Sequence, residues 1–258
     1  MYEVDLKGKN AVVFGVANHR SIAWAIAKVL NEAGAHIALT YQNERLGKEV
    51  RKLAPSLDKP LLFQCDVSSD EEVNATFQQL GKQMGKVDIV IHSIAFAHRE
   101  DLGGDFSNTP RDRFLQALDI SSYSLVSITK QVTPLMEKGG GSIVAMTFQA
   151  SERVFPGYNV MGTAKAALEN EIRQLASELG PRNIRINAIS AGPLDTLAAR
   201  GIHRFVDMKR SAAEKSPLQC NITHDEVAKT ALYLCSDLSS GVTGAILPVD
   251  AGYSIMGI

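Results

Sequence analysis

Short apolar runs recur along the whole chain and alternate with longer stretches in which apolar residues follow a helical period. The short runs are rich in aliphatic and β-branched residues, which predicts strands. We expect seven strands, at residues 10–15, 36–41, 61–67, 87–95, 141–148, 183–190 and 244–250. We expect helices at residues 21–34, 43–54, 69–85, 110–137, 158–180 and 223–237, with a looser stretch at 191–220.

This alternation predicts an α/β fold, namely a Rossmann-like, doubly wound, seven-stranded parallel sheet with helices on both faces. The predicted strands are nearly continuous apolar runs, as burial on both faces requires. No repeat, low-complexity tract or flexible linker divides the sequence, so we expect residues 1–258 to form a single domain. In such sheets, ligands bind beyond the carboxyl ends of the strands, where the strand order reverses.

The composition excludes several classes of function. With 27 basic and 28 acidic residues, the net charge of −1 lacks the basic excess of a nucleic-acid-binding protein. No apolar run approaches the roughly 20 residues that span a bilayer. The cysteines Cys65, Cys220 and Cys235 are odd in number and far apart, which predicts neither a disulfide framework nor a metal site. The N-terminus lacks a signal-peptide pattern, and we expect a cytoplasmic protein.

The segments that follow the first four predicted strands suit a dinucleotide. After the first strand, Gly15 permits a tight turn and Ser21 begins a helix whose free N–H groups suit a pyrophosphate, although the usual G-x-G-x-x-G pattern is absent. Asp66, with the Val67 backbone beside it, could accept a hydrogen bond from an adenine amine, or it could be an ordinary helix-capping carboxylate. Small residues follow the fourth strand at 92–97, where backbone can approach a ribose.

The end of the second strand, "TYQNER", bears on the choice of nucleotide. No acidic residue stands there to bind both hydroxyls of an adenosine ribose, and no basic residue directly follows the strand to hold a 2′-phosphate. Gln42 is neutral and could bond a ribose hydroxyl, which favours NADH. Arg45, one turn later, could still reach a phosphate, so NADPH stays open as the less favoured cofactor.

The candidate chemistry lies after the fifth predicted strand. Tyr158, Met161 and Lys165 are spaced to share one face of a helix, with Tyr158 and Lys165 about 10 Å apart along its axis. A Tyr ring and a long Lys side chain at that spacing can converge on one elongated ligand. The alternative is a Tyr that packs in the core and a Lys at its rim.

Taken in order, these motifs resemble the NADH-dependent enoyl-[acyl-carrier-protein] reductases, a divergent branch of the short-chain dehydrogenase/reductase superfamily. The Tyr-x6-Lys spacing is specific, because ordinary members of the superfamily use Tyr-x3-Lys and Met161 stands at that Tyr position here. The resemblance covers nearly the whole chain. The matching segments are "GVANHRSIAWAIA", "TYQNER", "CDV", "HSIAFA", "DISSYSL", "GYNVMGTAKAALE", "IRINAISAGPLDTLAARGI", "CSDLSSGVTG" and "VDAGYSIMG".

The resemblance implies a reaction and a role for each site residue. Hydride passes from NADH to the β-carbon of a trans-2-enoyl thioester carried by acyl carrier protein, in fatty-acid elongation. Tyr158 stabilises the enolate oxygen, and Lys165 holds the nicotinamide ribose. The other implied cofactor contacts are Gly15, Ser21, Ile22, Gln42, Asp66, Val67, Ser93, Ile94, Leu194, Asp195, Thr196, Leu197 and Ala198. The implied substrate contacts are Ala97, Phe148, Tyr158, Met161 and Phe205. A mobile lid at about 194–212 and a homotetramer are also implied.

The sequence departs from the family pattern at two predicted sites. Phe148 stands where the family usually carries Tyr, so the ring is kept and a hydroxyl is lost; we expect altered turnover rather than loss of activity. Asp195 stands where the family usually has Arg, which places a carboxylate near the predicted pyrophosphate. Gln219 and Cys220 stand at positions where basic residues are common in the family. Arg200, Arg204, Lys209 and Arg210 remain as candidates for contact with an acidic carrier protein.

Two other functions stay open at this point. One is a carbonyl reductase of the same superfamily, against which the displacement of the Tyr argues. The other is a nucleotide-binding homologue without catalytic activity, which only Phe148 and Asp195 favour.

Overall fold

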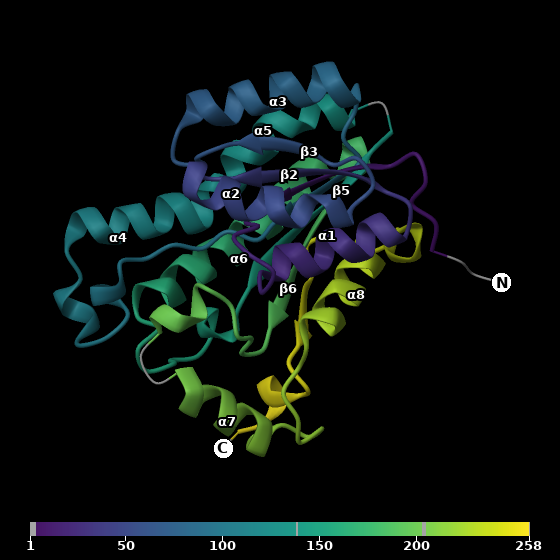
Figure 1. Cartoon of the computed structure of the whole chain (residues 1–258). Helices are drawn as coiled ribbons and strands as arrows, with labels where there is room; N and C mark the ends of the chain where they lie inside the picture. Colours follow the sequence, from purple (N-terminus) through teal and green to yellow (C-terminus); the bar gives the residue numbers. More distant parts are fainter. Residues whose placement is uncertain (1–3, 138, 203–204, 258) are drawn as a thin grey trace.

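Seven parallel strands form the sheet of the computed structural model, which describes residues 4–137, 139–202 and 205–257 (Figure 1). The strand order is β3-β2-β1-β4-β5-β6-β7, and every neighbouring pair is parallel. The predicted Rossmann-like, doubly wound class is therefore confirmed. The strands are β1 (Asn10–Phe14), β2 (His36–Tyr41), β3 (Leu61–Gln64), β4 (Ile89–His92), β5 (Gly141–Thr147), β6 (Ile184–Ala191) and β7 (Ile246–Val249).

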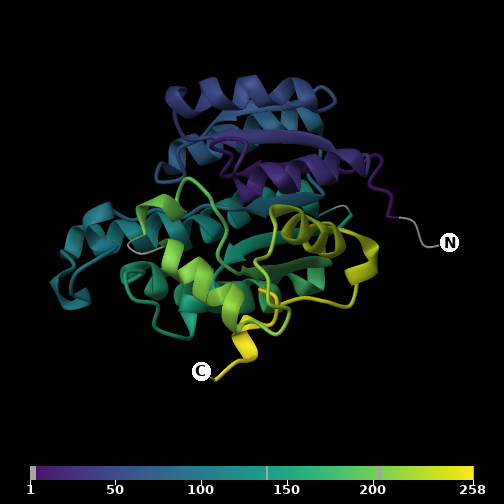
Figure 2. The ribbon, with the colours of Figure 1, turned by 60° about the horizontal axis from the view of Figure 1, so that its bottom comes forward.

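Helices cover both faces of this sheet. Figure 1 shows α3 and α5 on one side and α1 and α8 on the other. The helices are α1 (Ile22–Glu32), α2 (Glu44–Leu53), α3 (Asp70–Met84), α4 (Arg111–Leu118), α5 (Ser124–Met136), α6 (Val160–Leu179), α7 (Phe205–Lys215) and α8 (His224–Cys235). Figures 1 and 2 both show α7 beside the C-terminal segment, at one end of the molecule. No helix in the described ranges is long and apolar enough to cross a membrane.

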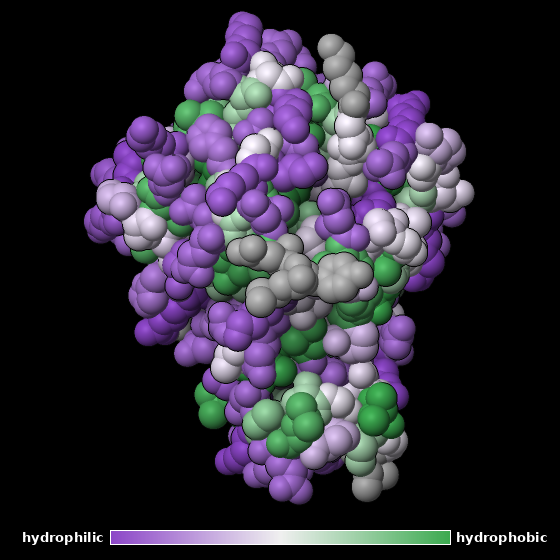
Figure 3. Space-filling model, turned by 90° about the vertical axis from the view of Figure 1, so that its right-hand side faces the viewer, coloured by the Kyte–Doolittle hydropathy of each residue, from purple (hydrophilic) through white to green (hydrophobic). Residues whose placement is uncertain are grey.

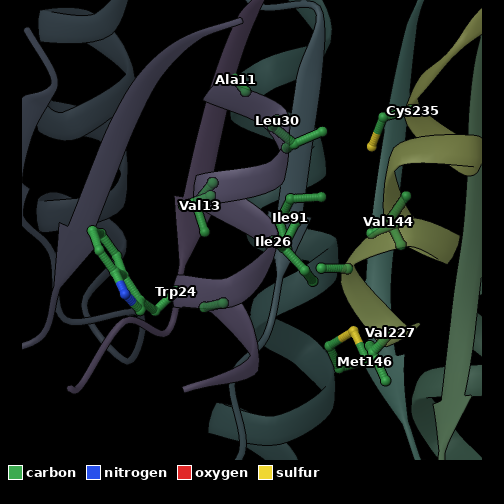
Figure 4. Packing of buried hydrophobic residues seen from close by; sticks show 14 of the residues in the cluster. Ala11, Val13, Trp24, Ile26, Leu30, Ile91, Val144, Met146, Val227 and Cys235 are labelled. Carbon is green, nitrogen blue, oxygen red and sulfur yellow. The ribbon is translucent and has the colours of Figure 1, made fainter. Parts of the chain in front are cut away.

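Alternating side chains of the strands divide the core into two layers. In β1, Ala11 and Val13 pack toward α1 and α8, whereas Val12 and Phe14 pack toward α3, α5 and α6. Figure 4 shows the first layer, in which Ile26 and Leu30 of α1 face the strands, while Trp24 points away from α8. Burial of both faces explains why the strands read as continuous apolar runs.

The strand order reverses between β1 and β4. From β1 the chain continues outward to β2 and β3 on one side, and from β4 it continues to β5, β6 and β7 on the other. The loops that leave the carboxyl ends of β1 and β4 therefore run to opposite sides and leave a crevice between them.

Two predicted helix boundaries were wrong. The helix expected at 110–137 is interrupted by a π-helical turn at Asp119–Tyr123, between α4 and α5. This turn sets Ser121 against the loop after β4, where its hydroxyl accepts from the Phe96 N–H (2.9 Å) and donates to the Phe96 carbonyl (3.0 Å). Such π-turns are common near functional sites. The looser stretch at 191–220 contains one regular helix, α7.

The helix expected from residue 158 begins at Val160. Asn159 adopts a positive φ of 39°, which is incompatible with a continuous helix. Its side-chain amide donates to the carbonyls of Gly103 (3.1 Å) and Gly104 (3.3 Å), and these bonds fix the turn. Tyr158 therefore lies on the turn before α6 and not in its first helical turn.

Candidate active site

A cleft of about 590 Å³ lies along the carboxyl ends of the strands. Its walls come from the loops after β1 to β6, from the start of α6 and from α7. Of the nineteen residues predicted to contact cofactor or substrate, all but Asp195 line this one cleft. They are Gly15, Ser21, Ile22, Gln42, Asp66, Val67, Ser93, Ile94, Ala97, Phe148, Tyr158, Met161, Lys165, Leu194, Thr196, Leu197, Ala198 and Phe205.

The loop after β1 approaches the end of β4 closely. Gly15 has a φ of 98°, and a Cβ atom at this position would overlap the carbonyl oxygen of Ser93. Only glycine fits that conformation and that contact. The Ser21 hydroxyl accepts from the N–H groups of Ala17 (2.9 Å) and Asn18 (3.1 Å), which fixes the turn into α1. The N-terminus of α1 thus faces the cleft, where its dipole favours a negatively charged group.

The ends of β2 and β3 are joined by a side-chain hydrogen bond. The Gln42 amide donates to one carboxylate oxygen of Asp66 at 3.0 Å. The other oxygen accepts from the N–H (3.0 Å) and the hydroxyl (2.8 Å) of Ser68. Partial burial raises the pKa of Asp66, but the hydrogen bonds from Ser68 and Gln42 outweigh it, and the net pKa lies below its ordinary value. Asp66 is therefore a charged acceptor at neutral pH.

Lys165 lies deep in the wall of the cleft, with 4% of its surface exposed. Its amine donates to the Met146 carbonyl at the end of β5, at 2.8 Å. Burial lowers the pKa of Lys165 to about 8. Tyr158 lines the same wall, and burial raises the pKa of its hydroxyl above the ordinary value. The site therefore presents a protonated phenol, which is a hydrogen-bond donor, and an amine whose charge depends on its surroundings.

Apolar side chains form the floor on the substrate side. Met161 packs with Leu102 and Ala164, and Ala97, Tyr158 and Ile202 lie against this small cluster. The phenol of Tyr158 therefore lies at the edge of an apolar part of the cleft.

The ring of Phe148 packs between two other rings. Its centroid lies 4.7 Å from that of Phe155 and 5.0 Å from that of Tyr158. Aromatic pairs at this separation stabilise each other's orientation. Phe148 therefore supports the ring of Tyr158, a contact that does not need the hydroxyl usual in the family.

Comparison with known proteins identifies the family. The family model described as enoyl-(acyl carrier protein) reductase matches residues 15–254. The chain belongs to this family. It is 48% identical to the NADH-dependent enoyl-[acyl-carrier-protein] reductase of a Nostoc species, over 99% of this chain and 100% of the relative. It is 51% identical to the NADPH-dependent reductase of Staphylococcus aureus, over 97% of this chain and 98% of the relative.

Solved structures agree with this assignment. The Bacillus cereus enoyl-acyl carrier protein reductase, with NADP⁺ and an indole naphthyridinone, superposes with a TM-score of 0.96 at 47% identity, covering 98% of this chain and 99% of that chain. The Anaplasma phagocytophilum reductase, in complex with NAD, has a TM-score of 0.94 at 44% identity, covering 98% of this chain and 96% of that chain. The family expected from the motifs is therefore confirmed.

Asp195 is the one expected cofactor contact that does not line the cleft. One of its carboxylate oxygens lies 3.9 Å from a guanidinium nitrogen of Arg20, on the loop after β1. Both side chains are substantially exposed, so this ion pair is screened by water. The Asp195 carboxylate therefore lies beside a basic side chain and outside the lining of the cleft.

Sequence reasoning missed several residues that shape the site. The cleft is also lined by Arg99, Gln116 and Met208. No motif or spacing in the sequence marks these three residues. Thr147 also lines it, and its hydroxyl donates to the buried carboxylate of Glu169 at 2.7 Å. The position of Thr147 at the end of a predicted strand was the only available clue. Among the described residues, no group of His, Cys, Asp and Glu is arranged to hold a metal ion.

Proposed function

We propose that this protein is an NADH-dependent enoyl-[acyl-carrier-protein] reductase, in which Tyr158 and Lys165 are the catalytic residues. The observation that carries the proposal is the placement of these two side chains in one cleft wall, seven residues apart in sequence, above an apolar floor. When bound, NADH supplies the hydride that reduces the β-carbon of a trans-2-enoyl thioester.

The residues of the cleft fit the parts of that cofactor. Because Gly15 has no side chain, the loop after β1 can pack against the Ser93 carbonyl, and the start of α1 offers N–H groups to a pyrophosphate in the cleft. Asp66 offers a charged acceptor for an adenine amine. Lys165 can donate to ribose hydroxyls, because a lysine amine has three donors and its bond to Met146 uses one.

Tyr158 serves the substrate. As negative charge develops on the thioester oxygen, the phenol donates a hydrogen bond to it, and this bond strengthens in the transition state. Residues 194–202 and α7 cover this side of the cleft. Their closure over the acyl chain excludes water and increases the effect of the phenol.

The preference for NADH is supported by the charge at the end of β2. The Gln42 amide is held by the Asp66 carboxylate, which would lie near the 2′-phosphate of NADPH and repel it. Arg45 also lines this part of the cleft and offsets part of that repulsion, so we propose a preference and not an absolute selection.

The carrier protein is the proposed source of the acyl group. Of the candidate basic contacts, Lys209 and Arg210 lie on α7, where Arg210 pairs with Asp207 at 2.9 Å. Arg200 lies in the short turn before α7, and Arg204 lies outside the described residues. We expect a lower KM for the enoyl group on carrier protein than on coenzyme A, and Lys209→Glu to raise only the former.

A homotetramer is the proposed assembly. Figure 3 shows a face that is mainly hydrophilic, with hydrophobic residues gathered toward the lower end, where α7 and the C-terminal segment lie in Figure 1. Exposed apolar side chains of these segments include Val206, Leu218 and Ile255. Apolar surface of this kind is typical of subunit contacts. Sedimentation equilibrium at micromolar concentration tests the proposal, since a mass equal to the 27.9 kDa chain would contradict it.

The activity is tested by NADH oxidation with a trans-2-enoyl thioester, comparing the wild type with Tyr158→Phe and NADH with NADPH. We expect consumption of NADH by the wild type and a decrease in kcat of about 100-fold or more in the variant. If the wild type binds NADH but reduces no enoyl thioester, the protein is a nucleotide-binding homologue. Oxidation of simple secondary alcohols with NAD⁺ would instead indicate a carbonyl reductase.

A further inference from the structure

The end of β5 contacts the catalytic region around α6 through three consecutive residues. The contacts join the Met146 carbonyl to the Lys165 amine, the Thr147 hydroxyl to the Glu169 carboxylate and the Phe148 ring to the Tyr158 ring. Two of these three contacts hold the side chains proposed to be catalytic. The third holds Glu169, to which neither the family motif nor the proposed mechanism assigns a role.

Glu169 is buried to an unusual degree for a carboxylate. Only 4% of its surface is exposed, and it lies one helical turn after Lys165 on α6. Residues four apart on a helix are neighbours on its surface. Glutamate is rarely buried to this extent unless a hydrogen-bond donor or a positive charge compensates it. Thr147 supplies the hydrogen bond at 2.7 Å, and the nearby ammonium of Lys165 supplies the charge.

The surroundings of Lys165 contain opposing effects. Burial lowers the pKa of Lys165 to about 8, whereas attraction by the Glu169 carboxylate raises it. His92, at the end of β4, also interacts with Lys165; burial lowers the pKa of His92 to about 3, so it is uncharged at neutral pH. From β5, the Met146 carbonyl accepts a hydrogen bond from the Lys165 amine, and the Thr147 hydroxyl donates to Glu169. Tyr158, near the start of the same helix, keeps its proton. Of these groups, Glu169 is the one whose negative charge raises the pKa of Lys165.

We propose that Glu169 is a positioning residue of this reductase: its carboxylate, anchored by the Thr147 hydroxyl one helical turn from Lys165, keeps the Lys165 amine charged. The inference rests on the proposed function, because it takes Lys165 to bind the ribose of NADH. Glu169 does not line the cleft, so it acts through Lys165 and not on the substrate.

The test is the pH dependence of NADH binding in Glu169→Gln, measured by nucleotide fluorescence between pH 6 and pH 9.5. The amide can still accept from Thr147, so the variant removes mainly the charge. If the pKa of Lys165 falls by about one, the charged fraction at pH 8 falls about fivefold, while the fraction at pH 6 changes by less than about 1.5-fold. We therefore expect about fivefold weaker NADH binding at pH 8 and nearly unchanged binding at pH 6. The kcat/KM for the thioester should follow the same profile.

Three further variants separate this role from a structural one. Glu171→Gln removes another partly buried carboxylate of α6, which accepts from the Ser122 hydroxyl at 2.6 Å, and should leave the pH profile as in the wild type. Thr147→Val frees the Glu169 carboxylate and should weaken NADH binding, whereas Thr147→Ser keeps the hydroxyl and should restore binding to within about twofold of the wild type.

The outcomes are distinct. A pH profile of Glu169→Gln that is superimposable on the wild type, or binding weakened by the same factor at every pH, overturns the inference. If Glu169→Gln does not fold, the two Thr147 variants provide the test. Equal NADH affinity of Thr147→Val and Thr147→Ser then overturns the inference. Binding of NADH needs no thioester, so a shifted profile in a protein without reductase activity would reject the proposed reduction and keep the effect of Glu169 on Lys165 and NADH binding.

Discussion

Gly15→Ala is the substitution that most directly tests how the cofactor end of the cleft is built. The new methyl group would overlap the Ser93 carbonyl oxygen and crowd its carbonyl carbon. Both are backbone atoms, so no side chain can rotate to make room. The backbone at Gly15 also has a φ of 98°, a region that residues with a Cβ atom rarely adopt.

The magnitude follows from two contributions. An L-residue forced into the left-handed region costs about 1–2 kcal/mol. Separating the loops enough to admit the methyl group breaks the bond from the Ser93 N–H to the Phe14 carbonyl (3.3 Å), worth about 0.5–1.5 kcal/mol, and disturbs packing at the ends of β1 and β4. We expect a total of about 3 kcal/mol. For a chain of this length, that lowers Tm by about 6–12 °C.

Gly85→Ala is the matched control. Gly85 also has a positive φ, of 74°, but a Cβ atom there would meet nothing within 4 Å. It ends α3, away from the cleft. This variant should lose only the conformational contribution and bind NADH as the wild type does.

The assay is thermal unfolding at one fixed protein concentration, together with NADH titration by fluorescence. We expect Gly15→Ala to unfold at a clearly lower temperature than Gly85→Ala and to bind NADH at least tenfold more weakly than the wild type. Equal Tm values for the two variants, with unchanged NADH affinity in both, would refute the reasoning that the contact between the β1 and β4 loops requires glycine.

Three other predictions concern the cofactor, the aromatic cluster and the thiols. Gln42→Arg places a cation beside the adenosine ribose and should raise kcat/KM for NADPH relative to NADH about tenfold or more; an unchanged ratio would contradict the proposed basis of preference. Phe148→Tyr keeps the ring contacts, so steady-state turnover should change by less than about tenfold; a gain of a thousandfold would mean that the natural residue serves another reaction. A thiol reagent at pH 7 should modify the exposed Cys220 first, because burial raises the pKa of Cys65 to about 11 and of Cys235 to about 12. Mass spectrometry of the native protein should show one label, and three equally fast labels would contradict this.

The sequence allowed the sheet to be predicted because its strands are buried on both faces. Each strand in the structure falls within or beside an expected apolar run, and the helices between them impose parallel pairing. The limits of the strands were less accurate. The run at 87–95 contains only four strand residues, Ile89–His92, because the chain then leaves the ladder to form the cleft. Hydrophobicity alone does not mark where pairing ends.

The candidate site was predictable where it depends on residue type at a strand end, and not where it depends on side-chain pairs. Gly15, Asp66 and Lys165 follow from position and spacing. The bond between Thr147 and Glu169 joins residues 22 positions apart, and no local pattern indicates it. The ion pair of Arg20 with Asp195 joins two loops that only the folded sheet brings together.

Two contacts, the ring pair of Phe148 with Tyr158 and the ion pair of Asp195 with Arg20, show how the structure accommodates the departures from the family pattern. At Phe148 the lost group is a hydroxyl, while the ring still packs against Tyr158 with a centroid separation of 5.0 Å. The phenol of Tyr158, which we propose to face the developing charge, therefore keeps this aromatic contact. At Asp195 the added carboxylate lies beside Arg20, is substantially exposed and does not line the cleft. Neither Phe148 nor Asp195 takes part in the hydrogen bonds that join Lys165 and Glu169 to β5. These bonds belong to the arrangement that we propose to keep the amine charged, so both departures leave it in place.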